Sequence, residues 1–416
     1  MSIAAKEAHP GRARWWILAF LFLSTVLNYV DRQTLSILAP MVQADLGIDD
    51  RGYASIVQGF LLAYTLAHLG AGWLTDRVGP KVGLALFVGW WSAANIVTGF
   101  VHSAIQLGAA RFALGLGEAG NYTAAPKTVS ERFPAHERGF AVGVYTAGAM
   151  VGATIAPPLI GWLALAHGWR MAFIATGALG FIWIIGWWLV HRNAPLAENG
   201  PDAAGREDGA AAGSLGWLPL LKQRPVWGLA MARMVTDPVW YFYLFWFPKY
   251  MIDERGMTLM QMAQVAWIVY LAADLGALGG GWASGRLVRR GMSPASSRLC
   301  LMAGAAVLAP LGASIAGGPS ITATFAFAAV VALAHLVFMT NITTLAVDTF
   351  PRQHVATIFG IIAAGSGFGG MLSTKLVGEL ASNGSYHNVF LGMAVLHPIG
   401  WLIAWWATRR PSRTAG

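Results

Sequence analysis

The chain has little cysteine and little charge for its length. Cys300 is the one cysteine among 416 residues, so no disulfide can form within the chain. Charged residues make up 11% of the sequence, whereas a soluble domain carries about 25%. Apolar residues make up 56%. These values exclude both an ordinary soluble domain and a small scaffold held together by disulfides.

Signatures of enzymes are also missing. The sequence has no Gly-x-Ser-x-Gly elbow, no Walker loop and no cysteine–histidine spacing typical of a metal site. A Gly115-x-Gly117-x-x-Gly120 string lies inside an apolar segment with no strand before it. We interpret it as a helix-packing feature, because a dinucleotide site needs the string between a strand and a helix. The sequence therefore predicts no enzyme, no cofactor and no metal.

Long apolar segments occur along the whole chain, and each is long enough to cross a bilayer as a helix of about 20 residues. We predict twelve spans, at 15–39, 53–74, 82–101, 104–126, 139–164, 170–190, 226–251, 259–284, 299–317, 320–346, 355–381 and 388–408. The first is longer than the apolar core of a signal peptide and carries charge, so we expect it to stay in the protein. The predicted fold is an all-α membrane protein.

The net charge of the chain is +9, and its basic residues are unevenly distributed among the loops. Lysine and arginine gather in alternate loops, whereas the first of the intervening loops carries Asp45, Asp49 and Asp50. This distribution is the positive-inside pattern of an even number of spans with both termini cytoplasmic. It indicates a bacterial-type inner membrane, with the lipid bilayer as partner and no nucleic acid.

The chain divides into two similar halves. We predict a six-helix bundle at 1–192, a polar cytoplasmic linker at 193–224 and a second six-helix bundle at 225–416. With a shift of 217 residues, Phe133-Pro134 falls on Phe350-Pro351 and four glycines coincide. The pairs are Gly143 and Gly360, Gly148 and Gly365, Gly152 and Gly369, and Gly161 and Gly378. Two parallel repeats around a midplane site are a transporter plan.

Four charged residues lie inside the predicted spans of the first half. Asp31 and Arg32 are in the first span, and Arg111 and Glu118 share one face of the fourth. Charge at membrane depth is costly and usually marks a substrate or proton pathway. A structural ion pair is the alternative. Because arginine stays charged when buried, it needs an acid or a substrate carboxylate beside it.

Burial and a neighbouring arginine act on a carboxyl group in opposite directions, so such acids can exchange protons near neutral pH. We therefore expect Asp31 and Glu118 to couple transport to protons, and Arg32 to bind a substrate carboxylate. Arg111 is predicted to pair with Glu118 and also to contact substrate.

Several motifs resemble those of known membrane transporters. The segment from Gly72 to Lys81 resembles the loop motif of the major facilitator superfamily. The segments 28–32, 111–119, 131–138 and 236–250 resemble the anion:cation symporter family, the last of them most closely its bacterial hexuronate transporters. The resemblance implies two pseudo-symmetric bundles around a central cavity and alternating access. It also implies a proton-coupled symporter for a small anionic sugar acid, functional as a monomer.

Other polar and aromatic residues in the spans are candidates for sugar binding. Tyr29 and Tyr64 match positions that the family uses for substrate. The remaining candidates are Asn121, Tyr145, Trp240, Tyr243, Asn341 and Ser366. For the aromatic residues, helix packing or an interfacial belt is the alternative.

Three charged residues are predicted to form a conformational latch. The resemblance places Asp76 and Arg77 in the loop motif, with the acid near the start of the helix in span eleven. We expect a basic partner such as Arg138.

Two other readings of the sequence stay open. The chain could carry another carboxylate, such as an aromatic or dicarboxylic acid. It could also be a transporter-like membrane sensor, although its loops are short for a signalling domain.

Overall fold

The computed structural model describes residues 10–192, 219, 221–382 and 386–409, and in these residues the regular structure is helical. Contacts divide the chain into two compact units. The N-terminal unit comprises 1–134, 144–215 and 352–357, and the C-terminal unit comprises 135–143, 216–351 and 358–416. Most of the predicted linker at 193–224 lies outside the described residues.

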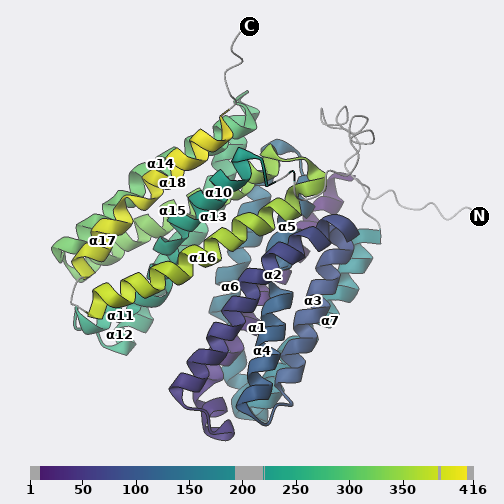
Figure 1. The fold of residues 1–416 in the computed structure, drawn as a ribbon, viewed down its shortest axis with the longest axis vertical. Coiled ribbons are helices and arrows are strands. Elements are labelled where there is room, and N and C mark those ends of the chain that lie inside the picture. The colour runs from purple at the N-terminus through teal and green to yellow at the C-terminus, as the bar shows by residue number, and fades with distance from the viewer. Residues whose placement is uncertain (1–9, 193–218, 220, 383–385, 410–416) are drawn as a thin grey trace, which may run out of the picture. The chain divides into compact units, whose positions relative to one another are not determined.

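The first half of the chain forms long helices that lie side by side (Figure 1). They are α1 (Pro10–Leu46), α2 (Asp50–Val78), α3 (Pro80–Thr98), α4 (Ala104–Glu118), α5 (Asn121–Arg132), α6 (Ala135–His167) and α7 (Trp169–Arg192). Within the N-terminal unit α2 packs on α4, and α7 packs on both α3 and α1.

The second half repeats this plan with more interruptions. Its elements are α10 (Arg224–Tyr241), a π-helical turn (Phe242–Trp246), α11 (Phe247–Asp253), α12 (Leu259–Val265), α13 (Trp267–Arg289), α14 (Pro294–Leu308), a 3-10 segment (Ala309–Gly317), α15 (Ile321–Thr349), a 3-10 turn (Arg352–His354), α16 (Val355–Ser382), α17 (Tyr386–Ala394) and α18 (Leu396–Thr408). Within the C-terminal unit α15 packs on α13 and α14, and α10 packs on α18.

Each predicted span coincides with a continuous or locally broken helical segment. Among the described residues, eight segments are long and apolar enough to cross a membrane by length and composition alone. The span predicted as one run at 104–126 is instead two helices, α4 and α5, that meet at 119–120. At this break the ring of Phe87 occupies the space that a side chain at residue 120 would need, so only glycine fits there.

Two of the four repeated glycine pairs serve the same purpose in both units. Gly148 and Gly152 of α6 face the backbone oxygens of α1, and Gly365 and Gly369 of α16 face those of α10. A methyl group at any of these positions would lie within 2.6 Å of a backbone oxygen of the facing helix. Small residues allow membrane helices to approach closely, so the sequence repeat is a repeat of helix contacts.

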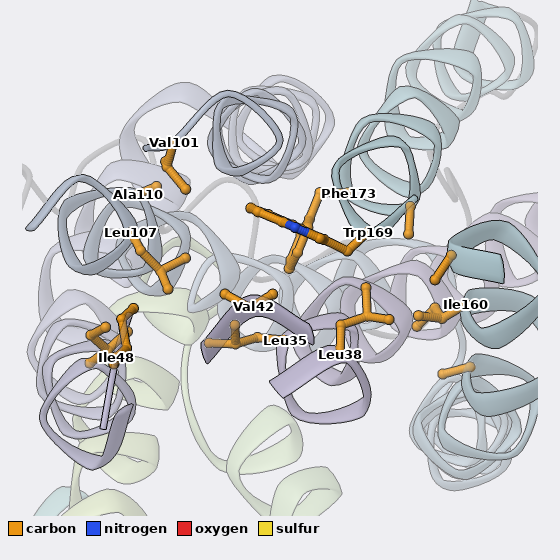
Figure 2. Close-up of a cluster of buried hydrophobic side chains, with 14 of the residues drawn as sticks. Leu35, Leu38, Val42, Ile48, Val101, Leu107, Ala110, Ile160, Trp169 and Phe173 are labelled. Carbon is orange, nitrogen blue, oxygen red and sulfur yellow. The ribbon is translucent and has the colours of Figure 1, made fainter. Parts of the chain in front are cut away.

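A cluster of buried apolar side chains fills one region of the N-terminal unit (Figure 2). It contains Leu35, Leu38 and Val42 of α1, together with Trp169 and Phe173 of α7. Val30, which directly precedes Asp31, belongs to the same cluster. The charged residues of α1 therefore border a packed, dry region.

Candidate functional site

A buried ion pair joins Arg32 on α1 to Glu118, the last residue of α4. Arg32 Nε donates to Glu118 Oε2 at 2.8 Å, and Arg32 Nη2 lies 2.8 Å from the same oxygen. The Glu118 side chain is fully buried, whereas that of Arg32 is 25% exposed. Glu118 Oε1 is buried and has no hydrogen-bond partner. Because buried polar atoms are normally paired, this open oxygen calls for an explanation.

Three aromatic rings surround the Arg32 guanidinium. Its central carbon lies 5.2 Å from the ring centroid of Tyr29, 5.5 Å from that of Phe60 and 4.5 Å from that of Tyr64. Rings at these distances attract the cation through their π faces without neutralising it. Arg32 can therefore keep its position when its carboxylate partner changes, which is what an anion-binding arginine requires.

The second acid, Asp31, is held by an amide rather than by an arginine. Asn95 Nδ2 donates to Asp31 Oδ1 at 2.8 Å and to Thr176 Oγ1 at 2.9 Å. Asn95 Oδ1 in turn accepts from Arg111 Nη1 at 3.4 Å. Asp31 Oδ2 is buried without a hydrogen-bond partner. One asparagine thus connects this acid to Arg111 and leaves one carboxylate oxygen open.

Arg111 and Glu118 are electrostatic neighbours, but the described contacts include no direct hydrogen bond between their side chains. Arg111 Nη2 instead donates to the backbone oxygens of Asp31 and Arg32, at 3.5 Å each. Residues seven apart on a helix are separated by about 10 Å along its axis, which is too far for a direct ion pair. Helix α1 brings the Arg32 side chain directly to Glu118, whereas the Asp31 carboxylate is connected to Arg111 through Asn95.

Two further candidates in this unit lie in helix contacts. Asn121 Nδ2 donates to Thr25 Oγ1 at 3.0 Å, and Asn121 Oδ1 accepts from Ser24 Oγ at 2.8 Å. These bonds fasten α5 to α1 and occupy both ends of the amide. Tyr145 is 2% exposed. A substrate could contact either side chain only after local rearrangement.

The candidates in the C-terminal unit separate into two kinds. Tyr243 is buried and packs against Phe242 and Phe247, so its surroundings are those of an apolar core. Trp240 stacks on His335 with ring centroids 5.6 Å apart and planes 5° apart.

Asn341 and Ser366 have polar neighbours. Asn341 Nδ2 donates to Val337 O at 2.9 Å, whereas Asn341 Oδ1 is buried without a partner. Ser366 Oγ accepts from Arg233 Nη2 at 3.5 Å.

Asp76 lies at the start of α16. Its carboxylate accepts from Ala356 N at 3.2 Å, from Thr357 N at 2.7 Å and from Thr357 Oγ1 at 2.6 Å. A carboxylate at this end of a helix satisfies open N–H groups and interacts favourably with the helix dipole. Its basic partner is Lys127, whose Nζ donates to Asp76 Oδ1 at 2.6 Å and to Arg352 O at 3.0 Å.

The structure pairs Arg138 with Asp348. Arg138 Nη1 donates to Asp348 Oδ1 at 2.9 Å, and Arg298 Nε donates to Asp348 Oδ2 at 3.1 Å. Arg77 lies over the ring of Trp73, 5.3 Å from its centroid. Asp76 and Arg77, adjacent in the loop motif, therefore have different neighbours.

The sequence did not identify several residues that the structure brings into these networks. Asn95 is an isolated asparagine in an apolar span, which is a signal that could have found it. Lys127 directly follows the predicted span 104–126, a position typical of a loop charge, yet it is 3% exposed. Arg233 precedes Asp237 by four residues, the spacing of a helical ion pair, and this signal was available as well.

Comparison with known proteins identifies the family. The family model described as Major Facilitator Superfamily matches residues 21–319 and 296–416. This chain belongs to the Major Facilitator Superfamily. It is a multi-pass membrane protein of a transporter family and is not an enzyme.

Two curated relatives carry names of sugar-acid transporters. The chain is 32% identical over 413 residues to the hexuronate transporter of Escherichia coli K12, with 94% of this chain and 93% of the relative covered. It is 34% identical over 278 residues to the galacturonate transporter of Dickeya chrysanthemi, with 65% of this chain and 81% of the relative covered. This superfamily transporter is therefore similar to transporters of sugar acids.

Solved structures support the fold. A proton:xylose symporter aligns with a TM-score of 0.74 at 12% identity, covering 96% of this chain and 97% of that one. The E. coli fucose:proton symporter in the outward conformation aligns with a TM-score of 0.70 at 16% identity, covering 94% and 99%. The predicted all-α fold of twelve transmembrane helices in two six-helix bundles, the major facilitator fold, is confirmed.

Proposed function

We propose that this protein is a proton-coupled symporter that imports a hexuronate, such as glucuronate or galacturonate, by alternating access. The observation that carries the proposal is the pair of Arg32 and Glu118. The arginine fork meets a single carboxylate oxygen, and the other oxygen, Glu118 Oε1, is buried and open. A proton on Glu118 Oε1 neutralises the carboxylate whose negative charge holds the ion pair with Arg32.

Exchange of carboxylates at Arg32 supplies the coupling. When Glu118 Oε1 takes a proton, the charge-assisted pair is lost and Arg32 retains its positive charge. A substrate carboxylate then replaces Glu118 and binds the fork through two parallel hydrogen bonds. Release on the other side reverses both steps, because loss of the proton restores the internal carboxylate.

Asp31 supplies a second proton position. Its Oδ2 is open, and its Oδ1 is held by Asn95, which also accepts from Arg111. In this proposal Arg111 keeps the local charge balanced while Asp31 changes its protonation. A change in the protonation of Asp31 can affect Arg32 because the two residues are adjacent in the chain. Arg111 also donates to the backbone oxygens of both.

The aromatic rings beside Arg32 suit a sugar acid. Tyr29 and Tyr64 both lie within 5.2 Å of the guanidinium carbon and carry hydroxyl groups. Such rings can stack on a pyranose while their hydroxyls bond to it. The hexuronate and galacturonate relatives support this substrate class. We place the protein in an inner membrane with both termini cytoplasmic, and we expect one chain to suffice.

Uptake into proteoliposomes tests the proposal. Purified protein is reconstituted, and radiolabelled glucuronate and galacturonate are supplied with and without an inward proton gradient. Accumulation that depends on the gradient is the expected result. Exchange without accumulation would remove the proton coupling, and no response to either sugar acid would remove the hexuronate assignment.

A further inference from the structure

The C-terminal unit contains an ion pair built like that of Arg32 and Glu118. On α10, Arg233 Nε donates to Asp237 Oδ2 at 3.0 Å, and Nη2 donates to the same oxygen at 2.7 Å. Asp237 Oδ1 is buried without a hydrogen-bond partner. The arginine side chain is 18% exposed and the aspartate side chain is 5% exposed.

The two pairs agree in each of these features. In both, one carboxylate oxygen receives Nε and Nη2 of a partly exposed arginine, and the other oxygen is buried and open. A pair that serves only to hold the structure gains from satisfying both oxygens, because an unpaired buried acceptor costs about 1–3 kcal/mol. The exposed arginine is able to meet a ligand, and the open oxygen is able to take a proton.

The surroundings of Asp237 include two further titratable groups. His335 on α15 and His397 on α18 are both buried, and His335 Nδ1 lies 3.1 Å from His397 Nε2. They are electrostatic neighbours of Arg233 and Asp237, respectively. From α16, Ser366 reaches Arg233 through its hydroxyl.

A proton added to this cluster is best placed on Asp237. Protonation of a histidine would create a second buried positive charge near Arg233, and His397 Nδ1 has no partner to receive its hydrogen. Protonation of Asp237 Oδ1 removes a buried negative charge instead. The charge-assisted hydrogen bonds between Arg233 and Asp237 are then weakened.

We propose that Arg233 and Asp237 form a second, proton-gated carboxylate subsite in the C-terminal unit. Asp237 Oδ1 gains one proton and becomes neutral, and Arg233 keeps its charge and binds the carboxylate of an organic anion in place of Asp237. This rests on the proposed function, because it assumes an organic-anion carrier. The occupant is a small organic carboxylate.

Proton counting in the full-length protein tests the subsite. Calorimetric titration in two buffers of different ionisation enthalpy gives the number of protons taken up per bound ligand. Acetate serves as the small carboxylate. We expect the wild type to take up one proton when acetate binds to protein already saturated with glucuronate.

Asp237→Asn is expected to remove that additional proton. Asp253→Asn is the matched control, because Asp253 also pairs with a basic residue four positions away but is 44% exposed, and it should leave the proton count unchanged. If Asp237→Asn does not fold, the double variant Arg233→Gln/Asp237→Asn removes both charges and should lose the same proton.

The result that overturns the subsite is no proton uptake when acetate is added to the glucuronate-saturated wild type. An unchanged count in Asp237→Asn would overturn it as well. Failure of the proposed function looks different, since the wild type would then not accumulate hexuronate in a proton gradient at all.

Discussion

Replacing Glu118 by glutamine should separate binding from energy coupling. Glutamine keeps the shape of the side chain and cannot exchange a proton. In the proposed mechanism, Arg32 leaves Glu118 only after Oε1 has been protonated, so that substrate and proton travel together. In Glu118→Gln the arginine has no internal carboxylate to leave, and we expect it to bind substrate without a proton.

The size of the effect follows from the number of open carboxylate oxygens in the N-terminal unit. Glu118 Oε1 and Asp31 Oδ2 offer positions for two protons per substrate. A gradient of one pH unit supplies about 1.4 kcal/mol per proton, which is about tenfold in concentration. With the membrane voltage held at zero, the wild type should reach an accumulation ratio of about 100. In Glu118→Gln, Arg32 is available to substrate whatever the protonation of Asp31, so neither proton has to travel with substrate and the expected ratio is about 1.

The assay compares two modes in the same proteoliposomes. Net uptake of labelled glucuronate is measured in the proton gradient, and exchange of labelled for unlabelled glucuronate is measured without it. Glu118→Gln should retain exchange and lose accumulation. Glu254→Gln, the same substitution at an exposed position, should behave as the wild type in both modes. If Glu118→Gln still accumulates substrate tenfold or more, Glu118 is not the coupling acid.

Three further substitutions test the other parts of the structure. Arg32→Lys replaces the planar fork by a single ammonium group and should weaken glucuronate binding by about tenfold or more, measured as the half-saturating concentration for exchange. Asp76→Asn removes the charge that Lys127 faces and should lower the free energy of unfolding by about 3 kcal/mol. We expect a lower temperature of thermal unfolding in detergent. An unchanged unfolding temperature would contradict the structural role of this pair. Gly152→Ala should destabilise the protein by about 1–3 kcal/mol through overpacking, whereas Gly161→Ala on the same helix has open space and should be neutral in the same measurement.

The sequence is sufficient for the helices because hydropathy depends on each segment alone. All twelve predicted spans coincide with helical segments, and the interpretation of the Gly115-x-Gly117-x-x-Gly120 string as a packing feature agrees with the contacts. A side chain at Gly115 would collide with the backbone of α2, and one at Gly117 would collide with Trp90 of α3. Breaks such as the one between α4 and α5 depend on a neighbouring helix, so a reading of one segment cannot place them.

The ion pairs are harder to predict because they depend on the register between helices. The spacing of Arg111 and Glu118 correctly puts both on one face of span four, but it does not say which residue of α1 stands opposite each of them. Asp76 shows the same limit. Its sequence motif indicates a basic partner, and only the packing of α5 brings Lys127 to it.

The two halves have kept similar helix contacts but differ in the positions of their charged residues. The shift that aligns the glycines of α6 with those of α16 also places His335 at the position of Glu118. In the N-terminal unit that position holds an acid paired with Arg32. In the C-terminal unit it holds an imidazole stacked on Trp240, and the acid lies on α10 instead.

A similar exchange affects the loop motif. With a shift of 209 residues, Gly72-Trp73 falls on Gly281-Trp282 and Asp76 falls on Gly285. A methyl group at Gly285 would collide with the backbone oxygen of His136 at the start of α6. No acid fits in that space, and Asp348 on α15 meets Arg138 and Arg298 instead. The two halves therefore share backbone contacts between helices, whereas their charged side chains lie on different helices, each beside a counter-ion. This is why the glycines reveal the repeat in the sequence and the charged residues do not.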